Sequence, residues 1–411
     1  MGSSRFPGKM LREIAGKPLI WHVIHRLRQS TAVTQIILAT SDQSVDDPLA
    51  TYVAALGIAV VRGPEQNVLQ RYLKALALTK AETILRITGD SPLIDPELID
   101  RLVTRLEESG ADYVRVSAPI SDCGIDPITR RALERIGAER ADHPAAIEHV
   151  TGYLSVDPDF ARRAVLAIDG EDRLVAGARL SVDTPADLIF IQAVYRRLGA
   201  AAGEARFGDV LRLLRAEPQL LAINEHVRQR PAEEKPVAVL IRCDGGHAIG
   251  LGHVVRCLAV AAQLRDRFSA AVTFAVGGDE AAFALVKAEA FPVRTMTDDA
   301  SGKALAAALR DVAPDLVLMD MRTPFSNAEI AVIRDATCDI AVLDDAGPRR
   351  LEADLSFFPP AGAALDWRGA KGERRIGFEF IPLREQFSPP PARKPTTPPM
   401  ALMPSKLLPD P

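Results

Sequence analysis

The sequence lacks the cysteine pairs, the excess of basic residues and the long apolar runs that mark zinc-binding, nucleic-acid-binding and membrane-spanning proteins. Only four cysteines occur among 411 residues, and no two of them form a CxxC pair. Neither a zinc site nor a disulfide framework is therefore indicated, and we expect reduced thiols in a cytoplasmic protein. The net charge of -4 lacks the basic excess that is usual in nucleic-acid binders. No apolar run is long enough to cross a bilayer, and the first residues lack the apolar segment of a signal peptide.

What the chain does have is the composition of a soluble globular protein, with 47% hydrophobic and 25% charged residues. A chain of 411 residues is longer than a single domain usually is, which favours two or three domains. Small acidic substrates remain compatible with the net charge, because they need only a local cluster of Arg and Lys. We expect small-molecule partners, with no nucleic acid and no membrane. Homo-oligomers stay open, because exposed sheet edges could drive association.

Short apolar runs alternate with longer amphipathic stretches along the chain, which is typical of βαβ units and mainly parallel sheets. The sequence predicts an α/β protein with two Rossmann-like domains at residues 1–224 and 237–387, a linker at 225–236 and a proline-rich, disordered tail at 388–411. The expected strands are 35–39, 58–61, 83–87, 112–116, 164–168 and 179–182, then 237–241, 271–276, 316–319 and 340–343.

The clearest predicted helix begins at Asp95-Pro96-Glu97. This tripeptide supplies an N-cap carboxylate, a proline at the first helical position and an acid in the first turn. Leu98, Leu102 and Leu106 then line one face at helical spacing.

The first segment with chemical potential is a small-residue loop followed by two cations. Gly2, Ser3 and Ser4 allow backbone N–H groups to approach phosphate oxygens. The Arg5 guanidinium can then donate two hydrogen bonds to a phosphate group, and the Lys9 ammonium can place a compact positive charge beside it. The alternative is a mobile polar N-terminus without function.

Two aspartates follow predicted strands directly. Asp90 lies in Arg86-Ile-Thr-Gly-Asp-Ser-Pro, and Asp183 lies in Arg179-Leu-Ser-Val-Asp-Thr-Pro. Ligands of open α/β sheets bind at the carboxyl ends of the strands, and two carboxylates there can share Mg²⁺ with triphosphate oxygens. For Asp183 a plain helix N-cap is the competing interpretation.

Together these segments resemble the cytidylyltransferases of the spore-coat polysaccharide protein F type and, more distantly, the CMP-Kdo and CMP-sialic acid synthetases. The resemblance covers about residues 1–220. It is carried by these segments: GSSRFPGK at the start, ATS at 39–41, Asp46-Asp47, Arg62-Gly63, Asn67-Val68-Leu69, RITGDSPLIDPELID, Glu148-His149-Val150-Thr151 and RLSVDTPAD.

The resemblance implies a fold of the GT-A kind and a Mg²⁺-dependent transfer of CMP from CTP to an acidic sugar. Arg5 and Lys9 would neutralise the triphosphate, and Asp90 and Asp183 would hold the metal ion. His149 would contact the sugar carboxylate or be a structural histidine.

Two departures from the family bear on activity. Family members carry a central strand before the Gly-Ser-Ser loop. Losing it would leave an unfilled slot in the sheet, so we hypothesise that the native chain starts upstream of Met1. In addition, Ile128 stands where the family has a glutamate, which leaves the acceptor sugar open.

The second region opens with a strand that runs into a glycine-rich turn, Asp244-Gly-Gly-His-Ala-Ile-Gly250-Leu-Gly252-His253. A helix predicted to begin near Gly252 would place His253 in its first turn. The positive end of the helix favours an anion near Gly250 and Gly252 and a neutral imidazole, as a general base requires. A glycine turn with a capping histidine is the alternative.

This string resembles the UDP-sugar hydrolases of the pseudaminic acid pathway and the spore-coat polysaccharide protein G type, over about residues 237–387. The family fold has two lobes of the GT-B kind. The resemblance implies that His253 is the base for water attack, with Asp244 nearby, and that the ligand is a UDP-sugar. It covers only the first lobe, so we expect little or no hydrolase activity.

The leading interpretation is a cytidylyltransferase for surface glycan biosynthesis that is fused to an incomplete hydrolase lobe. One alternative is a catalytically impaired chain that acts as a nucleotide-binding or assembly partner. Another is a glycosyltransferase, because both fold types host such enzymes.

Overall fold

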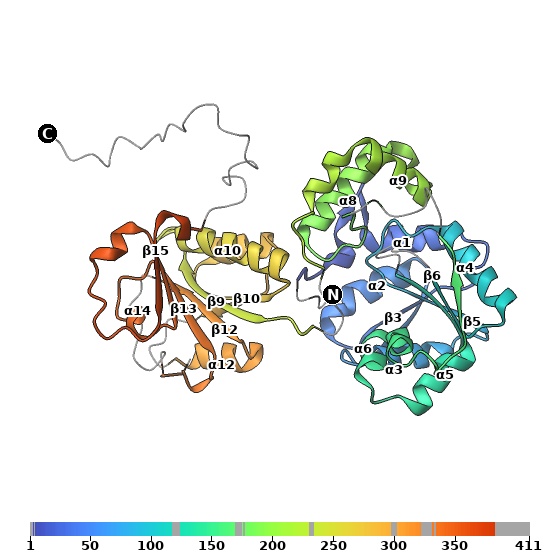
Figure 1. The fold of residues 1–411 in the computed structure, drawn as a ribbon, viewed down its shortest axis with the longest axis horizontal. Coiled ribbons are helices and arrows are strands. Elements are labelled where there is room, and N and C mark those ends of the chain that lie inside the picture. Colours follow the sequence, from blue (N-terminus) through green and yellow to red (C-terminus); the bar gives the residue numbers. More distant parts are fainter. Residues whose placement is uncertain are drawn as a thin grey trace.

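The fold was analysed in a computed structural model of the chain (Figure 1). The structure describes residues 3, 5–116, 124–168, 175, 177–229, 234–296, 302–321, 331–332 and 334–382. The expected tail, residues 388–411, lies outside this set, as do Gly2, Ser4 and Cys123. No described helix is both long and apolar enough to cross a membrane.

The N-terminal region alternates strands and helices. Its main elements are β1 (Glu13–Ile14), β2 (Lys17–Pro18), α1 (Leu19–Leu27), β3 (Ile37–Ser41), α2 (Asp47–Ala55), β4 (Ala59–Gly63), α3 (Val68–Leu76), β5 (Thr83–Ile87), α4 (Pro96–Ser109), β6 (Tyr113–Val116), β7 (Ile125–Thr129), α5 (Arg130–Glu139), α6 (Pro144–His149), α7 (Tyr153–Val156), β8 (Arg163–Leu166), α8 (Pro185–Leu198) and α9 (Phe207–Ala216).

The helix predicted at Asp95 forms as α4, and local chemistry sets both of its ends. The Asp95 carboxylate accepts a hydrogen bond from the Glu97 N–H, and Pro96 is the first helical residue. Gly110 ends the helix at a φ of 59°, a left-handed conformation that glycine adopts without steric cost. The apolar face of α4 packs into the main core together with α1, α8 and α9.

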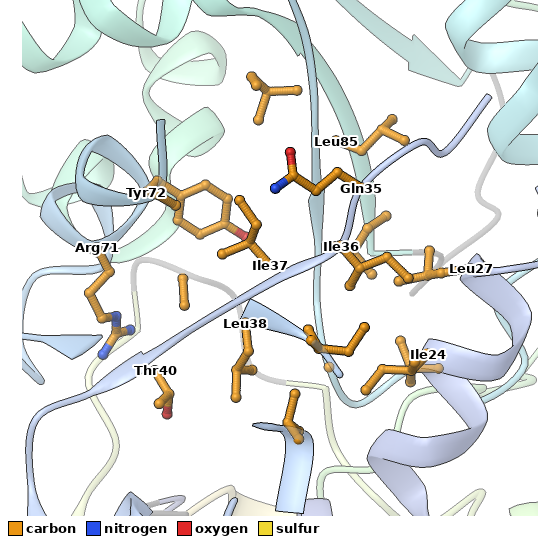
Figure 2. A pocket seen from close by; sticks show the side chains of 18 of the residues that line it. Ile24, Leu27, Gln35, Ile36, Ile37, Leu38, Thr40, Arg71, Tyr72 and Leu85 are labelled. Carbon is orange, nitrogen blue, oxygen red and sulfur yellow. The ribbon is translucent and has the colours of Figure 1, made fainter. Parts of the chain in front are cut away.

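The central sheet of this region is in two pieces. β3 pairs in parallel with β4, whereas β5 belongs to a separate sheet of order β5-β7-β6-β8. A cavity of about 480 Å³ is lined by residues of both β3 and β5, including Leu38 and Leu85, and by Ile24 of α1 (Figure 2). Each of the two strands thus has one edge that pairs with no described strand.

The C-terminal region forms one parallel sheet of seven strands in the order β11-β10-β9-β12-β13-β14-β15. Its elements are β9 (Ala238–Gly245), α10 (Gly252–Phe268), β10 (Ala271–Gly278), α11 (Glu280–Ala288), β11 (Val293–Met296), α12 (Lys303–Val312), β12 (Leu316–Asp320), β13 (Asp339–Leu343), α14 (Arg349–Glu352), β14 (Leu355–Phe358) and β15 (Glu373–Ile376). Helices α10 and α12 cover opposite faces of the sheet, and each encloses its own apolar cluster (Figure 1).

The α/β class with parallel-sheet, Rossmann-like regions is therefore confirmed, and most predicted strands are present within a few residues. One prediction is wrong: residues 179–182 form no strand. They pair with no described strand, and the Val182 N–H donates to the Asp90 carbonyl, in the loop after β5, at 2.9 Å. Six of the described strands were not predicted, namely the short β1 and β2 and the strands β7, β11, β14 and β15.

The segment expected as a linker contacts the C-terminal end of α10. The Arg228 N–H donates to the Asp266 carbonyl at 2.7 Å, and the Ser269 hydroxyl donates to the Arg228 carbonyl at 3.1 Å. The described cysteines, Cys243, Cys257 and Cys338, are buried and form no disulfide with one another.

Candidate functional site

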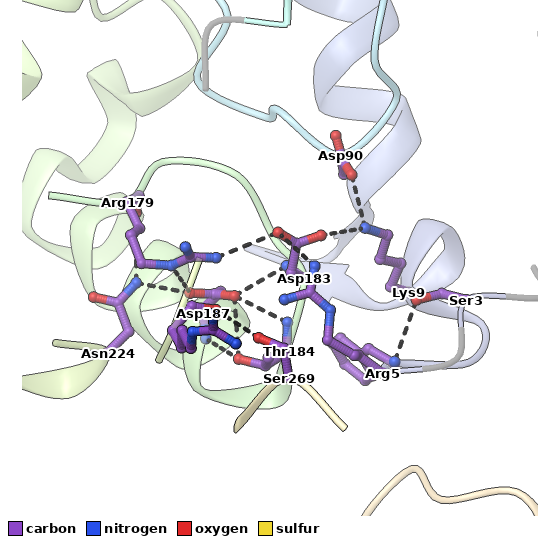
Figure 3. A network of polar contacts seen from close by, with 12 residues as sticks. Ser3, Arg5, Lys9, Asp90, Arg179, Asp183, Thr184, Asp187, Asn224 and Ser269 are labelled. Carbon is purple, nitrogen blue, oxygen red and sulfur yellow. Dashed lines mark hydrogen bonds and ion pairs between the residues drawn. The ribbon is translucent and has the colours of Figure 1, made fainter. Parts of the chain in front are cut away.

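Four predicted side chains from distant parts of the sequence meet at one place (Figure 3). Arg5 lies in the N-terminal loop, and Lys9 begins the short 3-10 helix Lys9–Leu11. Asp90 follows β5, and Asp183 precedes α8. The structure thus brings together the two cations and the two carboxylates that the sequence singled out.

The loop that carries the cations is held by its own sequence. Phe6 is buried in the main core and anchors the loop to the domain. Gly8 has a φ of 73°, a left-handed conformation that lets the chain turn directly into Lys9. Ser3 accepts a hydrogen bond from the Phe6 N–H through its hydroxyl at 3.3 Å. The Ser3 hydroxyl therefore stabilises the loop itself.

The Lys9 ammonium lies between the two carboxylates. Its Nζ is 2.7 Å from Oδ2 of Asp90 and 3.2 Å from Oδ1 of Asp183. Arg5 approaches the other oxygen of Asp183, with Nη2 at 3.2 Å from Oδ2. The Lys9 side chain is only 9% exposed, so this ion pair is shielded from solvent on most sides.

These contacts determine the protonation of the site. Burial alone would lower the pKa of Lys9, but the charges of Asp90 and Asp183 outweigh it, and the pKa of the ammonium is raised. Burial alone would raise the pKa of Asp183. The nearby charges of Lys9, Arg5 and Arg179 outweigh that effect and hold the pKa of this carboxyl below its ordinary value. Lys9 is therefore charged, and Asp183 is ionised, at neutral pH.

Asp183 is oriented by a buried network that the sequence analysis missed. Asp187, whose side chain is fully buried, accepts hydrogen bonds from the N–H groups of Asp183 and Thr184 at 3.0 and 2.9 Å. Arg179 bridges Asp183 and Asp187 at 3.3 Å to each, and Asn224 donates to Asp187 at 2.9 Å. The Thr184–Asp187 spacing is a capping box, which was the available signal.

A triphosphate with a divalent cation fits this donor set. Nη1 of Arg5 is buried and has no hydrogen-bond partner among the described residues, so a donor is available for a phosphate oxygen. The described residues hold no group of three or more His, Cys, Asp and Glu side chains placed for a metal ion. Mg²⁺ held by Asp90 and Asp183 would therefore need phosphate and water for its remaining ligands, which is how it is usually bound.

One other segment that carried the family resemblance, at Asp46, has a structural role. The Asp46 carboxylate accepts hydrogen bonds from the hydroxyls of Thr40 and Ser41 at 2.6 and 2.7 Å, which fixes the end of β3. Ile128 is buried in an apolar cluster of the N-terminal region that is separate from the main core. His149 ends α6, and its Nε2 has no hydrogen-bond partner among the described residues.

In the C-terminal region, His253 lies in the first turn of α10, as predicted. Its Nδ1 is 2.6 Å from a carboxylate oxygen of Asp320, the last residue of β12. Arg256 donates to both oxygens of Asp320 at 2.6 Å and to Asp344 at 3.1 Å. Burial alone would raise the pKa of Asp320, but His253 and Arg256 hold it below its ordinary value.

His253 and Asp320 lie where open parallel sheets usually bind ligands, at the carboxyl ends of the strands beside a reversal of strand order. β10 and β12 flank β9 on opposite sides, so the strand order reverses at β9. Nothing lies within 4 Å of a Cβ built on Gly250 or Gly252, so the space beside this turn is open. Asp244 forms an ion pair with Arg242. The carboxylate bonded to His253 is Asp320, which the sequence analysis did not single out.

Comparison with known proteins identifies relatives of the N-terminal region. Residues 1–166 match the family described as cytidylyltransferase. The spore coat polysaccharide biosynthesis protein SpsF of Bacillus subtilis is 34% identical over 224 residues, 53% of this chain and 92% of that protein. A 3-deoxy-manno-octulosonate cytidylyltransferase of Anaeromyxobacter sp. is 35% identical over 165 residues, 40% of this chain and 62% of that protein. A solved cytidylyltransferase of Leptospira borgpetersenii shares 23% identity at a TM-score of 0.49, over 54% of this chain and 92% of that chain. In its N-terminal half, the chain belongs to the cytidylyltransferase family.

Proposed function

We propose that the N-terminal region transfers CMP from CTP to an acidic sugar in a Mg²⁺-dependent reaction that serves polysaccharide biosynthesis. The observation that carries this proposal is the convergence of Arg5, Lys9, Asp90 and Asp183 at the carboxyl end of β5. The names of two relatives support the acidic sugar and the pathway. One relative is named for spore coat polysaccharide biosynthesis, and the other is a 3-deoxy-manno-octulosonate cytidylyltransferase.

In this reaction a hydroxyl of the sugar acid attacks the α-phosphorus of CTP. A new P–O bond forms as the bond to the bridging oxygen breaks, pyrophosphate leaves, and the hydroxyl proton passes to solvent. Asp90 and Asp183 would hold Mg²⁺, which neutralises charge on the triphosphate. Arg5 would donate to phosphate through its unpaired Nη1, and Lys9 would place its charge beside it. Nε2 of His149 makes no hydrogen bond among the described residues and lies 3.8 Å from a carboxylate oxygen of Glu148, and it is a candidate donor to the sugar carboxylate.

The test is a thermal shift with CTP, UTP, GTP and ATP, each with and without Mg²⁺. A ligand at about 100 times its dissociation constant adds roughly 2.7 kcal/mol, which is a rise of a few degrees. We expect a rise with CTP that requires Mg²⁺ and is lost in Asp90→Ala. Asp42→Ala, which removes an exposed carboxylate at the end of β3, should keep it. No rise with any nucleotide would reject the proposal.

A second candidate concerns residues 237–387, where His253 and Asp320 form a bonded pair at the strand ends. His253 would be the base of a UDP-sugar hydrolase site, with Asp244 and the turn at Gly250 and Gly252 beside it. UDP release from a UDP-linked diacetamido-trideoxyhexose by the full chain that His253→Ala abolishes would support this role. No UDP release would reject it.

A further inference from the structure

The Lys9 ammonium contacts the same two carboxylates that the proposed function assigns to the metal ion. It reaches Oδ2 of Asp90 and Oδ1 of Asp183 at once, and thereby ties the end of β5 to the start of α8 (Figure 3). A divalent cation shared by Asp90 and Asp183 would need the space between these oxygens. Lys9 and such a cation therefore exclude each other there.

The carboxylate oxygens of Asp90 and Asp183 that Lys9 does not contact are poor ligands for a divalent cation. Oδ2 of Asp183 is already paired with Arg5 at 3.2 Å and Arg179 at 3.3 Å, so cationic side chains hold both of its oxygens. Asp90 keeps one oxygen, Oδ1, without a hydrogen-bond or ion-pair partner among the described residues. A single carboxylate oxygen is a weak site for a cation that must give up hydration to bind.

The charge of the cluster leads to the same conclusion. Three carboxylates, those of Asp90, Asp183 and Asp187, face three cations, those of Arg5, Lys9 and Arg179. The formal charges cancel, so no negative excess attracts a free divalent cation. A triphosphate changes this balance, because it offers Arg5 and Lys9 new anionic partners. The flexible four-carbon stem of lysine allows such an exchange.

We propose that Lys9 is an exchangeable counter-ion that blocks the divalent cation site until a nucleoside triphosphate draws its ammonium away. This inference rests on the proposed function and deepens it. It fixes an order of events: the cation binds together with the triphosphate and does not bind beforehand. Lys9 would then have two successive partners, the carboxylates first and the phosphates second.

The experiment measures Mn²⁺ binding to the full chain by electron paramagnetic resonance of the free ion, with no nucleotide present. Wild type should bind Mn²⁺ weakly. Lys9→Met should bind it about tenfold more tightly or better, because two carboxylates lose a competing unit charge. Lys9→Arg, which keeps the charge, should remain weak. Lys17→Met removes an equal charge from an exposed lysine that lies over Trp21, and it should change the affinity by less than about twofold.

Wild type with CTP is also compared with CTP alone, because the nucleotide itself chelates Mn²⁺, and the protein should then take up Mn²⁺ about tenfold more tightly or better than it does without nucleotide. Lys9→Gln provides a second neutral variant that can still hydrogen-bond the carboxylates, in case Lys9→Met does not fold. Equal Mn²⁺ affinity for wild type and the neutral variants would overturn the proposal. The comparison of variants needs no CTP, so it decides the role of Lys9 even if the nucleotide shift fails and the proposed function falls.

Discussion

Asp183→Asn should slow CTP-dependent pyrophosphate release by about a thousandfold, because the variant loses both a metal ligand and the charge that sets the geometry of the site. The same change should lower the free energy of unfolding by about 2–4 kcal/mol, since it leaves Lys9, Arg5 and Arg179 without their shared counter-charge. Release is measured with a coupled phosphate assay and stability by denaturant unfolding. Asp42→Asn, at an exposed carboxylate, should change neither quantity.

The stability effect of Asp183 should depend on pH in one direction. Because the folded-state pKa lies below the unfolded value of about 3.9, the contribution is present above that value and is lost as pH falls through the folded pKa. Wild type and Asp183→Asn should therefore differ most near neutral pH and converge in acid. A constant difference down to low pH would mean that the loss comes from packing or from the amide, and not from the charge of Asp183.

The parts of this site that the sequence predicts are those set by neighbouring residues. Asp90 and Asp183 are recognisable because each ends an apolar run before a Ser-Pro or Thr-Pro step. Asp95 is recognisable as an N-cap from the proline and acid that follow it. These signals lie within a few residues of each aspartate, and Asp95 satisfies a backbone donor of the helix that it begins.

The parts that the sequence misses depend on contacts across long separations. Asn224 reaches Asp187 across 37 residues, and His253 reaches Asp320 across 67. Nothing in the local pattern of either residue specifies its partner. The bridge from Lys9 to both carboxylates is of the same kind, because the sequence assigns Lys9 only to phosphate.

Two secondary-structure errors have clear physical reasons. Residues 179–182 have alternating apolar residues, but none of the described strands pairs with them. Their side chains are buried by packing and by the Arg179 ion pairs. β7 was missed because Asp126 and Pro127 lie inside it. Its Asp126 is paired with Arg86 at 2.8 Å, which offsets the low strand preference of an aspartate.

The largest stability effect should come from the C-terminal region. Asp320→Ala should lower the free energy of unfolding of this region by about 3–5 kcal/mol, because it removes a buried carboxylate and leaves Arg256 without its main partner. The Asp320 side chain is 1% exposed and bonds both Arg256 and His253, so water cannot replace the lost charge. Unfolding is followed by the fluorescence of Trp367 in a Trp21→Phe background, since the chain has only two tryptophans.

Asp279→Ala is the matched control, because Asp279 also pairs with a histidine, His247, at 2.8 Å, but at the surface. Solvent screens an exposed pair and satisfies the groups left behind, so this variant should lose much less stability than Asp320→Ala. Asp279 also caps α11 by accepting a hydrogen bond from the Ala281 N–H, so an equal loss in both variants would mean that the burial of Asp320 adds nothing to the cost of such a local interaction. A much larger loss at Asp320 would mean that the buried carboxylate holds α10 against β12, and with it the orientation of His253.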